Sequence, residues 1–401
     1  MLAAAIALLT APLIADLIVC IAGNLRRTRA PRTARAENVR LAVVVPAHDE
    51  DLTIARTVQS LLAAGCSAHV AHPAGATAAG AWEASIFVVA HNCSDATAKM
   101  AAGAGARVIE LNDPRQRGKG AALRCGFEAA RRAGANAFLA IDADSVASPN
   151  LIPATCAALE AGAAATQCRY ELELPPTGPF RLLDRLRVLA FRAINVLRAR
   201  GRAGLGFSAG LFGNGFALTA GALERVPFSV NSICEDLEYH IRLVCAGLRV
   251  DWVEDASVYA PLARTRSAQA TQEARWEGGR FHVATRATGQ LLAAVFGGNW
   301  RVLEMLAEAW SLPLSRGILA LLLTAFLPVH WIHLFALAGA VLVLAYVLEA
   351  VFLGVEPWRD LAALVGAPLH MLWKLAITPL VLRQSRRGAE WARTRREAQL
   401  P

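Results

Sequence analysis

Asp142 and Asp144 stand one residue apart at the end of the apolar run 137–141. Because aspartate is uncommon inside strands, we expect this pair where a strand leaves its sheet. Residues i and i+2 of an extended chain point to the same side, so both carboxylates can face one cation. Mg²⁺ and Mn²⁺ prefer oxygen ligands of this kind, and a cation held in this way suits a diphosphate. The alternative for an isolated D-x-D is a polar turn that follows a strand.

The segments around this pair alternate between strand and helix patterns. The expected strands and helices, in order, occupy residues 41–46, 52–64, 85–90, 96–104, 107–111, 118–132 and 137–141, with a loop over 65–84. This alternation predicts an α/β fold with a mostly parallel sheet, in which ligands bind beyond the carboxyl ends of the strands. Acidic turns at 49–51, 95 and 142–144 would converge there.

The middle of the chain contains further helix and strand patterns. We expect helices over 150–161 and 233–246, strands over 167–174 and 249–253, and another helical stretch from Gln272. Residues 180–200 form an arginine-rich amphipathic pattern, which we interpret as a solvated helix face in preference to a helix on a membrane surface. The glycine-rich segment 201–215 allows the backbone to approach a ligand closely.

The composition indicates a membrane-associated protein. The 401 residues are 55% hydrophobic with a net charge of +9, and the mean hydropathy is +0.38. Much of the positive charge lies in two clusters, 26–40 and 383–396, and each follows an apolar stretch. This pattern is typical of cytoplasmic flanks of membrane segments rather than of a nucleic-acid surface. The eight cysteines include no C-x-x-C pair, and we expect them to be reduced in a cytosolic domain.

Three regions are apolar enough to meet a bilayer. Residues 2–23 are expected to form an uncleaved N-terminal anchor, in which Asp16 needs a partner, for example on another helix. Segments 312–329 and 334–353 predict a transmembrane hairpin, since the basic tail and the main domain should share the cytoplasmic side. Segment 361–382 is then interfacial or re-entrant.

These patterns divide the chain into five parts. They are an N-terminal anchor (1–25), an α/β domain (41–285), interfacial helices (286–311), a transmembrane hairpin (312–353) and a third apolar segment with a basic tail (354–401).

Several short motifs occur along the α/β region in a fixed order. They are PAHDED (46–51), VVAHNCSDATA (88–98), GKGAALRCGFEAA (118–130), AIDADSVASPNLI (140–152), GNGFAL (213–218), CEDLEYHIRLVCAGLRV (234–250) and QEARW (272–276). In this order the motifs resemble those of membrane-bound family 2 glycosyltransferases, in particular cellulose-, hyaluronan- and poly-N-acetylglucosamine-synthase-like proteins. Residues 391–394 also resemble the segment that follows the membrane helices of such enzymes. The resemblance implies the GT-A fold, a Rossmann-like nucleotide-sugar-binding domain.

The resemblance also implies residue roles on the donor side. Asp142 and Asp144 match the pair that holds the donor and a Mg²⁺ or Mn²⁺ ion. The other donor-binding positions are Pro46, Glu50, His91, Asp95, Lys119 and Arg275. His91 stands where many members have an aspartate near the uracil, which leaves open how this chain reads the base.

On the acceptor side, Asp236 matches the general base, and Glu235 precedes it in the same motif. For these two acids alone, the alternative is an acidic first helical turn stabilised by the helix dipole. The positions implied to bind the acceptor are Gly213, Asn214, Gln272 and Trp276. For Trp276 the alternative is an aromatic anchor of an amphipathic helix at the membrane.

The implied activity is an inverting transfer of a sugar from a nucleotide-sugar, a UDP-sugar in the first instance, at the cytoplasmic face of the cell (inner) membrane. The acceptor would be a growing polysaccharide of the envelope or an exopolysaccharide, or else a lipid-linked acceptor. Export or assembly partners are possible, and no nucleic-acid partner is expected. A single-addition lipid glycosyltransferase is the alternative. More distant alternatives are a non-catalytic scaffold or transport component, against which the retained acids argue, and a nucleotidyltransferase, which would not be expected to carry Q-x-x-R-W.

Overall fold

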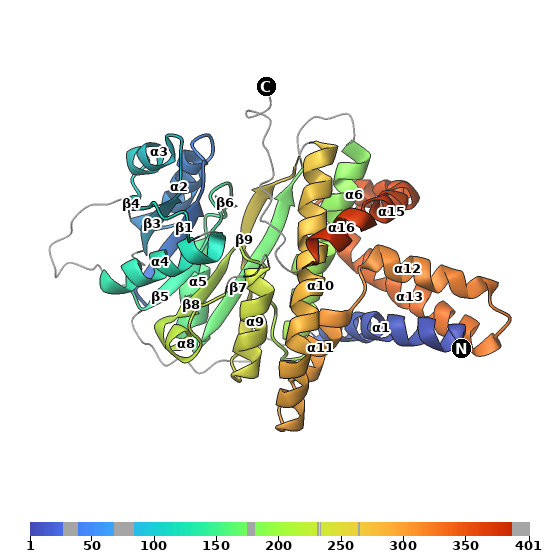
Figure 1. The fold of residues 1–401 in the computed structure, drawn as a ribbon. Helices are drawn as coiled ribbons and strands as arrows, with labels where there is room; N and C mark the ends of the chain where they lie inside the picture. Colours follow the sequence, from blue (N-terminus) through green and yellow to red (C-terminus); the bar gives the residue numbers. More distant parts are fainter. Residues whose placement is uncertain are drawn as a thin grey trace.

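The computed structural model of the chain describes residues 1–26, 39–67, 84–116, 118–174, 181–230, 232, 234–263 and 265–386. An α/β domain with a large sheet lies on one side, and a group of apolar helices projects from the other (Figure 1). The long helix α10 (Arg266–Phe296) stands between them. The predicted loop over 65–84, most of the first basic cluster and the motif at 391–394 fall largely or wholly outside the described residues.

Within the described residues, the sheet contains nine strands in the order β2-β3-β1-β5-β8-β7-β9-β6, and β4 also pairs with β3. The strands are β1 (Leu41–Ala47), β2 (Cys66–Ser67), β3 (Ala84–His91), β4 (Arg107–Leu111), β5 (Ala137–Ala140), β6 (Val146–Ala147), β7 (Ala165–Glu173), β8 (Phe216–Thr219) and β9 (Val250–Pro261). The parallel part, β4-β3-β1-β5, confirms the predicted alternation. The sheet as a whole is mixed, because β8 runs antiparallel to both β5 and β7.

The helices of the α/β domain cover both faces of this sheet. They are α2 (Ile54–Ala63), α3 (Thr97–Gly103), α4 (Lys119–Arg132), α5 (Leu151–Glu160), α8 (Ala220–Arg225) and α9 (Glu235–Cys245). The side chains of strand β1 alternate between the two faces of the sheet. Leu41, Val43 and Val45 pack with α2, α3 and α5 on one face, and Ala42 and Val44 pack with α4 and α9 on the other. A strand buried on both faces reads as a continuous apolar run, which explains why β1 could be recognised in the sequence.

The remaining helices join this domain to the apolar region. They are α1 (Leu2–Arg26), α6 (Arg181–Arg192), the π-helix η1 (Ala193–Arg198), α7 (Ala199–Gly204), α11 (Val302–Trp310), α12 (Leu314–Leu323), the short η2 (Thr324–Phe326), α13 (His330–Phe352), α14 (Pro357–Ala363), η3 (Leu364–Gly366), α15 (Ala367–Ala376) and α16 (Thr378–Gln384). Helix α10 continues through residue 285, where the sequence analysis placed the end of the α/β domain.

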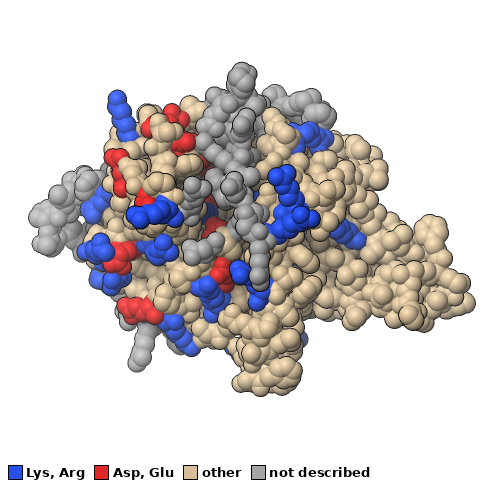
Figure 2. All heavy atoms as spheres, in the orientation of Figure 1, with Lys and Arg blue, Asp and Glu red and all other residues tan. Residues whose placement is uncertain are grey.

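Among the described residues, α1 and α13 are each long and apolar enough to cross a membrane. Two further spans are possible if bent pairs count as one each: α11 with α12 and η2, bent by 72°, and α14 and α15 with α16, bent by 48°. The segment Leu314–Phe326 has thirteen residues, about 20 Å of helix, which is too short to cross a bilayer alone. The projecting helices show few charged side chains in the space-filling view, consistent with membrane association (Figure 2).

Helix α1 lies backbone to backbone against α7. A Cβ atom added at Gly23 would overlap the carbonyl group of Gly201, and one added at Gly201 would overlap the backbone of Cys20. Small residues permit this kind of close helix contact in apolar surroundings. The first membrane-type helix is therefore packed directly onto the segment that follows β7.

The prediction that residues 180–200 present a solvated face is wrong. Arg185, Arg187, Arg192, Arg198 and Arg202 along α6, η1 and α7 are at most 8% exposed. Apart from Arg187, they pair closely with acids on helices distant in sequence. The pairs are Arg185–Asp360, Arg192–Asp360, Arg198–Asp16, Arg198–Glu308, Arg202–Glu304 and Arg202–Glu308. The Arg198–Asp16 pair, at 3.0 Å, confirms the hypothesis that Asp16 has its partner on another helix.

Candidate active site

The D-x-D pair follows β5 in the turn that leaves the sheet. Ile141 and Ala143 are buried, whereas Asp142 and Asp144 are partly exposed and line one large cavity. This alternation is the one expected for residues i and i+2. The structure therefore places both carboxylates on the same side of the chain.

Lys119 is the first residue of α4 and reaches the D-x-D turn. Its ammonium forms an ion pair with Asp142 and donates a hydrogen bond to the carbonyl oxygen of Gly213, at 2.6 Å. Burial acts to lower the pKa of Lys119, but the carboxylates of Asp142 and Glu235 raise its pKa above the ordinary value. Lys119 therefore stays charged at the centre of an acidic site.

The buried side chain of Asn214 stabilises the D-x-D turn by hydrogen bonds. Its side-chain oxygen accepts a hydrogen bond from the Asp142 backbone N–H at 3.1 Å, and its amide group donates to the Ser145 hydroxyl at 2.8 Å. Gln167 in turn donates to the Asn214 carbonyl oxygen at 2.7 Å. Asn214 is fully buried and does not line the cavity. The predicted acceptor contact of Asn214 is thus replaced by a positioning role, because its hydrogen-bonding groups are used within the protein.

The acids of the C-E-D motif begin α9. The backbone N–H of Leu237 donates to Oδ1 of Asp236 at 2.8 Å. The other oxygen, Oδ2, points toward Gly213: a Cβ atom added there would lie 3.3 Å from Asp236 Oδ2 and 3.4 Å from Lys119 Nζ. Burial raises the pKa of the Asp236 carboxyl and raises that of Glu235 to about 7, while the Lys119 ammonium opposes both shifts. A carboxylate with a raised pKa is a stronger base toward a hydroxyl.

The turns after β1 and β3 form the opposite end of the site. Asp49 has a φ of +51°, and its Oδ1 accepts a hydrogen bond from the Ser94 backbone N–H at 2.7 Å, which ties the two turns together. His91 is buried, and its Nε2 atom lies 2.8 Å from the Gln116 carbonyl oxygen. Burial lowers the pKa of His91, so this ring is neutral near pH 7 and cannot replace the charge of an aspartate.

Asp95 is hydrogen-bonded within the first two turns. Its Oδ1 accepts hydrogen bonds from the backbone N–H and hydroxyl of Thr97, and its Oδ2 accepts one from the Asp51 N–H at 3.2 Å. Asp95 does not line the cavity. The predicted donor contact is therefore not what the structure shows, because both oxygens are used to fix the first two turns.

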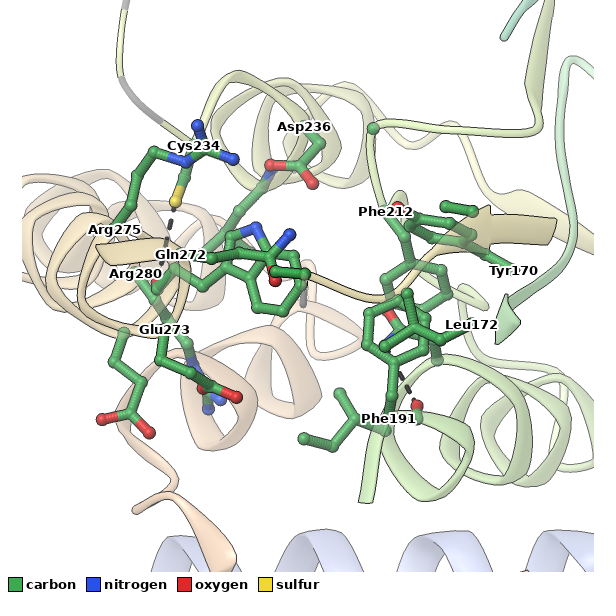
Figure 3. Close-up of a pocket in the computed structure, with 18 of the residues that line it drawn as sticks. Tyr170, Leu172, Phe191, Phe212, Cys234, Asp236, Gln272, Glu273, Arg275 and Arg280 are labelled. Carbon is green, nitrogen blue, oxygen red and sulfur yellow. Dashed lines mark hydrogen bonds between the residues drawn. The ribbon is translucent and has the colours of Figure 1, made fainter. Parts of the chain in front are cut away.

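Helix α10 supplies the Q-x-x-R-W residues from the side of the membrane-type helices. Gln272 and Arg275 face the same space as Asp236, and an aromatic wall stands opposite (Figure 3). Trp276 joins this wall, since its ring centroid is 5.7 Å from that of Phe191. The indole therefore packs inside the site and is not an anchor on the membrane surface.

Part of this wall and several basic residues of the cavity were not predicted from the sequence. The wall is completed by Tyr170, Leu172 and Phe212, and the cavity also contains Arg187 and Arg280. Tyr170 and Leu172 occupy alternate positions of β7. The strand pattern of 167–174 therefore already placed them on one face, although it did not show that this face borders the cavity.

A single cavity of about 2100 Å³ connects these groups. Twelve of the fourteen residues predicted to form the site line it. They are Pro46, Glu50, His91, Lys119, Asp142, Asp144, Gly213, Glu235, Asp236, Gln272, Arg275 and Trp276. The same cavity extends to apolar residues of the membrane-type helices, including Leu9 of α1, Ile318 of α12 and Val347 of α13.

The residues at the D-x-D end fit a divalent cation. Asp142 and Asp144 offer hard oxygen ligands on one side of the chain. The ion pair between Lys119 and Asp142 shows that this carboxylate already stands where it can hold a positive charge. Glu50, Glu235 and Asp236 line the same cavity as this pair, so a cation and an anionic diphosphate together suit the local charge.

Comparison with protein families matches residues 39–279 to the family described as "Glycosyltransferase like family 2". The match spans more than half of the chain and includes all nine described strands of the sheet and all fourteen predicted site residues. The chain belongs to this family and is a nucleotide-sugar-dependent glycosyltransferase with a GT-A-like fold. No curated protein matches the chain in a sequence comparison.

Solved structures include one of similar extent. The mannosyltransferase PcManGT from Pyrobaculum calidifontis, in complex with GDP-Man and Mn²⁺, has a TM-score of 0.50 at 17% identity. The match covers 93% of this chain and 99% of that protein, so it includes the apolar helices. Glucosyl-3-phosphoglycerate synthase from Mycobacterium tuberculosis is 21% identical over 63% of this chain and 80% of its own, with a TM-score of only 0.41.

Proposed function

We propose that the chain is an inverting glycosyltransferase that moves a sugar from a UDP-sugar to a lipid-linked acceptor or a growing polysaccharide at the cytoplasmic face of the membrane. The observation that carries this proposal is the single cavity, which joins the D-x-D pair and Asp236 to the apolar helices. In this view α1 anchors the chain, the bent segment of α11, α12 and η2 forms a membrane hairpin with α13, and the last apolar helices lie at the interface.

The chemistry follows from the positions of the side chains. Asp236 would take the proton of an acceptor hydroxyl as the oxygen attacks C1 of the sugar, and one such displacement inverts the anomeric centre. The Arg275 guanidinium would pair with the departing diphosphate, and Trp276 with the aromatic wall would hold the acceptor by its apolar face. Asp142 and Asp144 would hold Mg²⁺ or Mn²⁺, which supplies charge neutralisation of the diphosphate.

The donor side has two supports. Lys119 and the acidic pair meet at the cavity end nearest the first two turns. The solved PcManGT complex contains GDP-Man and Mn²⁺, and the glucosyl-3-phosphoglycerate synthase has been solved with UDP-Glc and Mn²⁺. Since His91 is neutral and buried, the base specificity must be tested with both nucleotides.

The transfer is either a repeated addition to a polysaccharide or a single addition to a lipid. The apolar cavity walls from α1, α12 and α13 favour a lipid-bearing acceptor. The described residues contain only two to four possible membrane spans. These are few helices from which to build a polymer channel within one chain.

The experiment is a transfer assay with membranes that contain the protein. Labelled UDP-sugars and GDP-mannose are supplied with Mg²⁺ or Mn²⁺, and the product is partitioned between organic solvent and high-molecular-mass material. The double variant Asp142→Asn/Asp144→Asn is the inactive control. Label in the organic phase would support single addition to a lipid, and label in polymer would support a polysaccharide synthase. Absence of label above the control with every donor would contradict the proposal.

A further inference from the structure

Arg187 differs from the other four buried arginines of α6, η1 and α7, each of which has a carboxylate oxygen within 3.0 Å of its guanidinium nitrogens. Its side chain is 4% exposed, yet among the described residues its Nε and Nη1 atoms have no hydrogen-bond partner. Its nearest carboxylate oxygen, in Glu273, lies 3.9 Å from Nη2. By contrast, Arg185 on the same helix is 2.8 Å from an oxygen of Asp360. Because burying a charge without close partners is costly, Arg187 is placed to bind an anion.

Glu273, the acid that pairs with Arg187 among the described residues, cannot satisfy it, because Glu273 is shared. Glu273 binds the Lys374 ammonium more closely than it binds Arg187. The Lys374 ammonium also lies 2.8 Å from a carboxylate oxygen of Glu277, and Glu277 forms a second ion pair with Arg316. The remaining charged groups that act on Arg187 are Asp184, which is attractive, and Arg266, which is repulsive. Burial lowers the pKa of Arg187, and Glu273 opposes this only in part.

The surroundings of Arg187 are partly apolar and belong to the cavity. Its guanidinium lies 5.9 Å from the ring centroid of Trp373. Arg187, Lys374 and His370 line the cavity together with Leu364 and Met371 of the last apolar helices. The cavity volume of about 2100 Å³ is about twice the upper end of ordinary small-molecule sites, so it has room beyond a nucleotide-sugar.

We propose that Arg187 binds the phosphate group of a lipid headgroup whose apolar chain lies along the membrane-type helices. Guanidinium and phosphate match in charge and in paired hydrogen-bond geometry, and the unpartnered Nε and Nη1 atoms provide the donors. This inference rests on the proposed function, because it names the chemistry of the lipid that enters the acceptor side of that cavity.

The test uses the purified full chain in a non-ionic detergent and dihexanoyl phosphatidic acid, a water-soluble lipid with a phosphate headgroup. Calorimetric titration measures its binding, with dihexanoylglycerol and inorganic phosphate as comparison probes. We expect the phosphatidic acid to bind about tenfold or more tightly than either probe, and Arg187→Met to lose about tenfold or more of that affinity. Arg132→Met, which removes a surface arginine paired with Glu128, should bind like the wild type.

Equal binding of dihexanoylglycerol would overturn phosphate recognition, and equal binding of inorganic phosphate would overturn the lipid as its source. Unchanged affinity in Arg187→Met would overturn the role of the residue. Binding of UDP with Mn²⁺ to the same samples reports the donor side. Failure of the wild type to bind UDP or GDP would contradict the proposed function, whereas retained nucleotide binding without lipid binding would contradict only this inference. If Arg187→Met loses nucleotide binding as well, the variant Arg187→Lys decides, because lysine keeps the charge but lacks the paired donors of a guanidinium. We expect Arg187→Lys to bind the lipid several-fold more weakly and to retain UDP binding. Unchanged lipid binding in this variant would overturn the assignment.

Discussion

The Lys119 ammonium forms an ion pair with Asp142, the first acid of the D-x-D pair, while it also binds the Gly213 carbonyl oxygen. One cation thus links the start of α4, the turn after β5 and the glycine-rich segment before β8. Burial raises the pKa of both Glu235 and Asp236 at the start of α9, and the same ammonium opposes this shift. Lys119 therefore links the D-x-D pair electrostatically to the two acids that begin α9.

The first prediction concerns this lysine. Lys119→Met should weaken the binding of UDP with Mn²⁺ by about tenfold or more, because a charge-assisted contact to the diphosphate is lost and Asp142 is released. Equilibrium dialysis with labelled UDP measures the change. Lys99→Met, which removes an exposed lysine on α3, is the matched control. If Lys119→Met binds UDP as the wild type does, Lys119 only holds Asp142 in place and does not contact the donor.

The second prediction separates catalysis from helix capping at α9. Asp236→Asn should reduce transfer by at least about a hundredfold while UDP binding is retained, because the amide cannot accept the acceptor proton. Glu238→Gln removes another acid of the same first turn, one that pairs with Arg242 and does not line the cavity. This control should keep transfer close to wild type. Similar losses of transfer in both variants would indicate that the acids act only on the helix terminus.

The third prediction is a pH dependence of stability that arises from Glu235. Burial raises its pKa from 4.5 to about 7. Between these values the folded protein keeps a proton that the unfolded chain has released, so the free energy of unfolding should fall as the pH rises from about 4.5 to 7. The variant Glu235→Gln carries no titrating group there and should lose this part of the slope. Denaturant titrations at several pH values measure it, and equal slopes in both proteins would contradict the assigned shift.

The sequence predicted the part of the fold in which local pattern and burial agree. Strand β1 is buried on both faces, so its apolar run was unambiguous. The prediction for the arginine-rich segment 180–200 was wrong because its partners are remote: Asp360 lies 175 positions from Arg185 and 168 positions from Arg192. A pattern of charges on one helix does not show that acids on another helix will neutralise it in the interior.

The sequence predicted which residues form the candidate site. It did not predict which of their polar atoms form hydrogen bonds within the protein. The motifs identified the turns that meet at the carboxyl ends of the strands, as the topology requires. They did not show that backbone N–H groups occupy the oxygens of Asp95, or that Asn214 is fully buried behind Asp142. The aromatic wall and Arg187 were missed because their role depends on β7, α6 and α10 packing around one cavity, which no single segment reveals.

The last prediction uses two glycines with the same backbone constraint. Gly213 has a φ of +74° and Gly162 a φ of +90°, so alanine should cost roughly 1–2 kcal/mol of stability at either position. A Cβ atom at Gly213 would lie 3.3 Å from Asp236 Oδ2 and 3.4 Å from Lys119 Nζ, whereas one at Gly162 meets no described atom within 4 Å.

Gly213→Ala should therefore lower the rate of transfer by about tenfold or more, since small displacements of reacting groups are costly. Gly162→Ala should share only the loss of stability, seen as a lower Tm in detergent, and keep the wild-type rate below that temperature. Rates measured at saturating donor, together with thermal melting of both variants, make the comparison. If the two variants lose equal activity, the close approach of Asp236 and Lys119 around Gly213 has no part in transfer, and the backbone strain alone explains the effect.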